Sequence, residues 1–150
     1  MRFLSTTPAP ALWLGIAGIL PFYACLLVAA LGWAHHPLIP INAMAIYAAV
    51  VLSFLGAAWW GLAVHAPPAL PVGRFYVWGA VGVLLGWGAL MLPTNKGLAL
   101  LMAGYLGQNL VDHGLAFRHP SLFPRWLLSF RRALTVGVVL ALILASALLP

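Results

Sequence analysis

The sequence predicts an all-α, polytopic membrane protein, a bundle of five transmembrane helices with its N-terminus inside and its C-terminus outside. The first supporting observation is the composition. Hydrophobic residues make up 65% of the chain and charged residues 5%, whereas an ordinary soluble domain has about 25% charged residues. Seven Lys or Arg and one acidic residue could not cover the surface of a soluble protein of this size. A bilayer, in contrast, favours apolar side chains on the lipid-facing surface.

The second observation is the division of the chain into five apolar stretches. About 20 apolar residues in a helix cross the ~30 Å hydrocarbon core of a membrane. The expected spans are residues 10–33, 41–64, 75–92, 97–117 and 127–149. The joints "HHPLIP", "HAPPALPVG", "LPTNKG" and "RHPSLFPR" are rich in proline and glycine, and they are too short for an extramembrane domain. We therefore expect residues 1–150 to form a single integral membrane domain.

The first span has Arg2 in front of a long apolar region, as a signal peptide would. However, this region is longer than the 7–15 residues of a typical signal core, and no clear small-x-small cleavage site follows it. We therefore expect this span to remain in the protein as its first helix.

Small residues recur on one face of the second and third spans. The second span carries Ser53 and Gly56, followed one turn later by Trp60, and the third carries Gly82 and Gly86. Such faces let helices approach closely. They predict helix packing, either within this bundle or against another subunit.

The fourth span contains Asp112, the only acidic side chain in the sequence. Tyr105, Gln108 and Asp112 fall on one helical stripe, which should face the bundle because polar side chains avoid lipid. A carboxylate at the bilayer centre costs about 2.5–3.5 kcal/mol on insertion scales, and the cost should be smaller for Asp112, about 7–8 Å from the inner edge. Arg131 and Arg132 are candidate partners, and a pair with Arg131 would tie the fourth helix to the fifth. The alternative is a proton-relay or ligand-binding carboxylate.

The fifth span begins at "FPRWLLSFRR", which predicts a helix start along the membrane interface with Pro124 near the first helical position. Five spans place six arginines on one side of the membrane and Lys96 on the other. The six are Arg2, Arg74, Arg118, Arg125, Arg131 and Arg132. The positive-inside rule then puts the N-terminus inside.

His65 and His113 should lie at similar depth on different helices. Such a pair can ligate a haem axially, and one histidine can ligate a chlorophyll-type pigment. The simpler interpretation is a pair of hydrogen-bonding histidines near the interface, so no cofactor is predicted. No two-cysteine metal motif occurs, because Cys25 is alone, and no metal site is predicted.

Four stretches together resemble a known family. They are "AIYAAVVLSFLGAAWWGLAV", "GILPFYA", "YLGQNLVDHGLA" and "FPRWLLSFRRALT". The chain resembles the uncharacterised membrane family called domain of unknown function 3429, which includes proteins named transmembrane protein 69. The resemblance implies a five-helix inner-membrane protein of unassigned activity. It also implies that Gln108, Asp112, Trp126 and Arg131 correspond to residues of the family pattern. One departure is Trp59, which stands where the family pattern has a histidine, and this puts any ligand or proton-carrying role of that histidine in doubt here.

The residue inventory argues against catalysis. One acid cannot supply a pair of catalytic carboxylates, and no glycine-rich phosphate loop with a lysine is present. The scattered cations argue against nucleic-acid binding. We therefore expect no enzyme but a non-catalytic accessory, assembly or stabilising subunit of a larger membrane complex, with energy-conversion complexes as the first place to look. Its partners would be the lipid bilayer and other membrane subunits, in a bacterial inner membrane.

Two alternatives stay open from the sequence. The first is a carrier or binding protein for a proton-coupled or hydrophobic small molecule, with Asp112, Gln108 and Tyr105 lining its site. The second is a haem- or pigment-binding subunit, which would use the two histidines.

Overall fold

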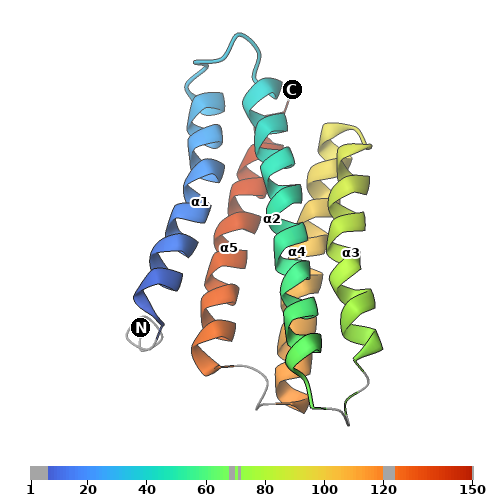
Figure 1. The fold of residues 1–150 in the computed structure, drawn as a ribbon. Coiled ribbons are helices and arrows are strands. Elements are labelled where there is room, and N and C mark those ends of the chain that lie inside the picture. Colours follow the sequence, from blue (N-terminus) through green and yellow to red (C-terminus); the bar gives the residue numbers. More distant parts are fainter. Residues whose placement is uncertain (1–6, 68–69, 71, 120–123, 150) are drawn as a thin grey trace.

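A computed structural model describes residues 7–67, 70, 72–119 and 124–149. Its described residues form five α-helices and no strands, in the order α1 (Ala9–Ala30), α2 (Leu38–His65), α3 (Gly73–Leu90), α4 (Thr94–Arg118) and α5 (Arg125–Ala147). Successive helices run in opposite directions, so the start of α1 and the end of α5 lie at opposite ends of the bundle (Figure 1). The predicted all-helical class and the order of the five helices are confirmed.

Three of these helices are long and apolar enough to cross a membrane. They are α1, α2 and the Trp126–Ala147 part of α5. Helix α3 has only 18 residues, which include Arg74, and α4 carries several polar side chains, among them Lys96, Gln108 and Asp112. The predicted set of five spans is therefore supported by hydropathy for three of the helices in the described part of the chain.

Helix ends differ from the predicted spans by a few residues. Helix α1 ends at Ala30, three residues before the predicted end, because Gly32 adopts a left-handed conformation with φ +65°. The Gly32 and Trp33 amides then bond back to the carbonyls of Ala29 and Val28, which satisfies carbonyl groups at the helix end. Helix α2 begins earlier than predicted, at Leu38, with Pro40 in its first turn, where proline needs no backbone partner.

Helix α2 organises the bundle, because it packs against α1, α3 and α4. Most of its buried residues are small or aliphatic, and they join buried residues of the other helices in one hydrophobic core. A second, smaller cluster contains Trp59, Ala63 and Phe75 where α2 ends and α3 begins. Helix α1 lies at the edge of the bundle, with Phe22 as its fully buried residue.

Glycines allow α2 and α3 to approach at backbone distance. A Cβ atom added to Gly82 would lie 2.9 Å from the Leu52 carbonyl oxygen, and one added to Gly86 would lie 2.9 Å from that of Ala49. At Gly56 the added atom would collide with the Gly79 carbonyl. Since real Cβ contacts of this length are essentially absent, this interface excludes any larger residue unless the helices separate.

Three tyrosine hydroxyls connect neighbouring helices by hydrogen bonds to backbone carbonyls. The Tyr105 hydroxyl of α4 donates to the Ala48 carbonyl of α2 at 2.9 Å. Tyr23 of α1 donates to Gly137 of α5 at 3.0 Å, and Tyr47 of α2 donates to Gly18 of α1 at 3.1 Å. These bonds satisfy hydroxyl groups that lipid could not.

Candidate functional site

Asp112 lies inside the bundle, with 1% of its surface exposed. Its Oδ2 atom is 3.0 Å from the Nε atom of Arg131, which is also buried. This oxygen accepts no hydrogen bond from the described residues, so the contact is an ion pair held by charge. It joins α4 to α5 (Figure 1).

The other oxygen of Asp112 accepts from two side chains. Trp59 of α2 donates its Nε1–H to Oδ1 at 3.1 Å, and Gln108, one turn earlier in α4, donates at 3.4 Å. Arg131 also donates from Nη2 to the Leu55 carbonyl of α2 at 3.4 Å. We call Trp59, Gln108, Asp112 and Arg131 the buried polar cluster, and it joins α2, α4 and α5.

The sequence-predicted stripe on α4 faces the interior of the bundle. Tyr105 is 1% exposed and Gln108 is 3% exposed. Gln108 meets Asp112, whereas the Tyr105 hydroxyl bonds to the backbone of α2. The stripe is therefore engaged by neighbouring helices. None of its three residues lines any of five cavities of about 270–460 Å³ in the described part of the chain.

Arg132, the other predicted partner of Asp112, is exposed. It borders a shallow depression of about 270 Å³ between α4 and α5, together with Asn109 and Thr135. In the described residues the ion pair of Asp112 is made with Arg131. The two adjacent arginines point differently because neighbouring residues on a helix lie about 100° apart around its axis.

The two candidate histidines are each bound to their own helix. The Nδ1 atom of His65 lies 2.9 Å from the Gly61 carbonyl, and that of His113 lies 2.8 Å from the Asn109 carbonyl. His65 is exposed and His113 is half-buried. Among the described residues, no group of three or more His, Cys, Asp or Glu could hold a metal ion.

The predicted packing residues of α2 and α3 lie at the interface of these two helices or beside it. Gly56, Gly82 and Gly86 form the close contact described above. The Trp60 Nε1–H donates to the Tyr76 carbonyl of α3 at 3.1 Å. Ser53 bonds instead within its own helix, to the Ala49 carbonyl at 2.8 Å.

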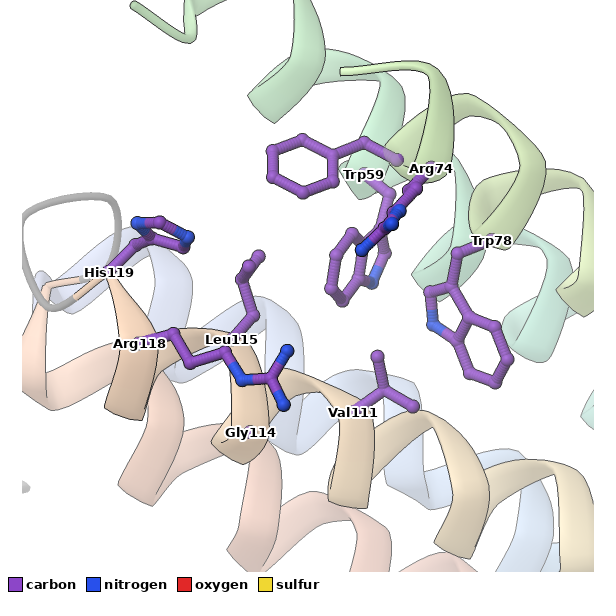
Figure 2. A pocket seen from close by; sticks show the side chains of 9 residues that line it. Trp59, Arg74, Trp78, Val111, Gly114, Leu115, Arg118 and His119 are labelled. Atoms are coloured by element: carbon purple, nitrogen blue, oxygen red, sulfur yellow. The ribbon is translucent and has the colours of Figure 1, made fainter. Parts of the chain in front are cut away.

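A cavity of about 430 Å³ lies beside the buried polar cluster, where α2 ends, α3 begins and α4 ends (Figure 2). Trp59 forms part of its wall, and Arg74, Arg118 and His119 also line it. Sequence reasoning assigned no site to this position. The only signal was the gathering of arginines on the predicted inner side of the membrane.

Sequence reasoning also missed the role of Trp59. This residue drew attention only as a departure from the family pattern, yet its indole supplies a direct hydrogen bond to Asp112. It is 2% exposed, so an indole nitrogen at this position needs an acceptor within the protein.

Comparison with known proteins identifies the family of the chain. The sequence profile of the family described as "Protein of unknown function (DUF3429)" matches residues 7–147.

The chain belongs to this family.

Curated relatives of this DUF3429 protein are named "Transmembrane protein 69". The relative from Xenopus tropicalis is 32% identical over 144 residues, which cover 95% of this chain and 56% of the relative. The relative from Mus musculus is 27% identical over 151 residues, covering 97% of this chain and 60% of the relative. The chain thus spans a little over half the length of these curated relatives. No solved structure gives a significant match.

The family resemblance predicted from the four sequence stretches is therefore confirmed. This DUF3429 chain is a membrane protein. Its relatives are named as transmembrane proteins, and three of its helices have the length and hydropathy to span a membrane.

Proposed function

We propose that all five helices cross the membrane and that the chain is a non-catalytic accessory or stabilising subunit of a larger membrane complex. The N-terminus would be inside and the C-terminus outside, in a bacterial inner membrane. Support for this orientation comes from the charges of the bundle. The start of α3 with Arg74, the end of α4 with Arg118 and the first half of α5 with Arg131 and Arg132 belong to one end of the bundle. The start of α4, which carries Lys96, lies at the other end (Figure 1). Cations favour the inner side.

The observation that carries the non-catalytic proposal is the engagement of Asp112. Both of its oxygens contact donors from the bundle, and the residue is 1% exposed. A general acid or base must come within hydrogen-bond reach of its substrate. Since Asp112 lines neither the cavity of about 430 Å³ beside it nor four other cavities among the described residues, a structural role fits its surroundings better than proton transfer.

The outer surface supports a role beside other membrane proteins or lipid. Large hydrophobic side chains are exposed on all five helices, among them Leu14, Phe54, Trp87, Leu110 and Val136. This surface must be covered by lipid or by another membrane subunit, because exposure of such a large apolar surface to water is unfavourable.

Native gel separation of mildly solubilised membranes tests the subunit role. Membranes from cells that express the tagged chain at its natural level would be compared with membranes from a matched deletion strain. We expect the chain to co-migrate with a defined larger assembly, and we expect this assembly to decrease in the deletion strain. Migration of the chain alone, with every membrane assembly unchanged by the deletion, would contradict the proposal.

A second candidate function is the binding of a hydrophobic molecule. An apolar cavity of about 460 Å³ lies between α1, α2 and α5, and it is lined by Leu14, Gly18, Phe22, Phe54 and Phe130, with Arg131 at its border. Mass spectrometry of the purified protein would detect a retained apolar compound. Gly18→Leu should displace it, since a Cβ at Gly18 meets only the Tyr47 hydroxyl, at 4.0 Å, and the rest of the leucine side chain would occupy the cavity. If the natural protein and the Gly18→Leu variant retained the same compounds, in the same amounts and with the composition of the bulk lipid, this function would be ruled out.

A further inference from the structure

The cavity beside the buried polar cluster combines an apolar wall with a basic rim. Its wall contains the aromatic rings of Trp59, Phe75 and Trp78 and the aliphatic side chains of Val111 and Leu115. Trp59 and Phe75 meet edge to face, with ring centroids 5.5 Å apart. Because Trp59 is also held by Asp112, this part of the wall is fixed before any ligand arrives.

Two arginines from different helices border this cavity. Arg74 lies at the start of α3 and Arg118 at the end of α4, and both side chains reach toward the space between Trp78, Val111 and Leu115 (Figure 2). His119 adds a third nitrogen-bearing side chain. The rim is therefore rich in hydrogen-bond donors.

The sequence offers these arginines no carboxylate side chain. Asp112 is its only acidic residue, and Asp112 pairs with the buried Arg131. The counter-charge for Arg74 and Arg118 must then come from outside the side chains of this protein. A mobile solvent anion could supply it, but the apolar wall also favours a ligand with a hydrophobic part.

Trp78 provides an independent indication of a ligand. Its Nε1 atom is buried and has no hydrogen-bond partner among the described residues. The nitrogen lies on the side of the ring that faces Val111 and Arg118 (Figure 2). A buried donor without an acceptor is destabilising, and a ligand oxygen in the cavity would relieve this once the indole turns toward it.

We propose that this cavity binds the phosphate group of an anionic phospholipid. Arg74 and Arg118 contact the phosphate oxygens, the Trp78 indole donates to a headgroup or ester oxygen, and the upper part of an acyl chain packs on Val111 and Leu115. Arginine forks match phosphate geometry, and basic pockets between transmembrane helices on the inner side are suited to anionic headgroups. The inference depends on the membrane placement of the bundle but not on its role in a larger complex.

Native mass spectrometry of the full chain in a neutral detergent tests this proposal. The protein would be titrated with phosphatidylglycerol and, separately, with phosphatidylcholine of the same acyl composition. We expect one phosphatidylglycerol to bind preferentially. Arg74→Gln and Arg118→Gln should each weaken this binding roughly fivefold, and the double variant roughly 25-fold, if each arginine contributes about 1 kcal/mol.

Matched controls separate the cavity from general surface charge. Arg132→Gln removes an exposed arginine near the same end of the bundle but outside the cavity, so it should leave the lipid preference unchanged. Arg74→Lys with Arg118→Lys keeps the charges but not the forked geometry, and it should retain more of the preference than the double glutamine variant. Trp78→Phe keeps an aromatic side chain but removes the donor, and it should weaken binding severalfold.

Three outcomes would overturn the proposal. The first is equal binding of the two lipids by the natural protein. The second is a loss of preference in Arg132→Gln as large as that in the double glutamine variant. The third is displacement of the bound lipid by millimolar inorganic phosphate, which would assign the site to free phosphate. Thermal unfolding of each variant verifies that it is folded, since both arginines of the rim are exposed and their replacement should not disrupt the bundle.

Discussion

Asp112 and Arg131 bring opposite charges into the interior of a helix bundle, where Asp112 is 1% and Arg131 8% exposed. Removal of buried charges from water costs several kcal/mol for each ion, and the cost is offset only where the charges meet and their remaining lone pairs and protons find partners. Trp59, Gln108 and the Leu55 carbonyl supply such partners here. The geometry therefore fits a pair that fixes how the helices align.

Trp59→Phe tests the hydrogen bond to this pair. Phenylalanine keeps most of the ring but lacks the Nε1–H group that Asp112 Oδ1 accepts. Since hydrogen bonds to charged groups contribute about 1.5–3 kcal/mol, we expect the free energy of unfolding to fall by about this amount in detergent-based unfolding. Trp87→Phe is the control, because Trp87 is 63% exposed and should change stability little. Equal effects of the two substitutions would refute the role of Trp59.

The sequence was informative about Asp112 because a single acid in an apolar chain has few partners. Helical spacing placed Gln108 on its face, and the span order placed Arg131 near its depth. The spacing could not choose between Arg131 and Arg132, since this depends on the rotation of α5 about its axis. It also could not identify Trp59, because contacts between distant segments follow from tertiary packing.

At the scale of helices, the contact between α2 and α3 depends on residues without side chains. Gly56→Ala should lower the free energy of unfolding by about 1–3 kcal/mol, because the added Cβ would collide with the Gly79 carbonyl. A collision with backbone cannot be relieved by rotation of a side chain, so the helices must separate.

Gly61→Ala provides the control on the same helix. A Cβ atom at Gly61 meets nothing within 4 Å, and alanine favours the helix over glycine by about 1 kcal/mol. Gly61→Ala should therefore be neutral or slightly stabilising. If Gly56→Ala were also neutral in the same unfolding assay, the close approach of α2 and α3 would be wrong.

Helix positions were predictable to within a few residues, because long apolar runs and proline-rich joints mark them directly. The ends were less predictable, as Gly32 shows. Its left-handed conformation ends α1 within an apolar run that continues to Trp33. Composition alone does not reveal which glycine adopts such a conformation.

At the scale of the whole molecule, the arginines favour one orientation of the bundle. Cysteine labelling in a Cys25→Ser background tests it. His35→Cys lies in the link between α1 and α2, and His119→Cys lies at the end of α4. We expect a membrane-impermeant maleimide to label His35→Cys in intact cells and to label His119→Cys only after permeabilisation. The reverse pattern would contradict the proposed orientation.

The buried polar cluster is also where the structural and the proton-handling interpretations of Asp112 diverge. Asp112→Asn keeps an acceptor for Trp59 but removes the charge, and Arg131→Gln removes the opposite charge. Each single change leaves an uncompensated buried group, so each should lower the free energy of unfolding by about 3–5 kcal/mol.

A double-mutant cycle on Asp112 and Arg131, measured as the free energy of unfolding of the full chain in mild detergent, is the most direct test of this structural role. We predict that the double variant is more stable than the sum of the single effects implies, with a coupling of about 1–3 kcal/mol. In the matched cycle, the exposed Arg132→Gln replaces Arg131→Gln, and its effect on the free energy of unfolding should simply add to that of Asp112→Asn. A coupling near zero for Asp112 and Arg131, or an Asp112→Asn variant as stable as the natural protein, would contradict a structural ion pair.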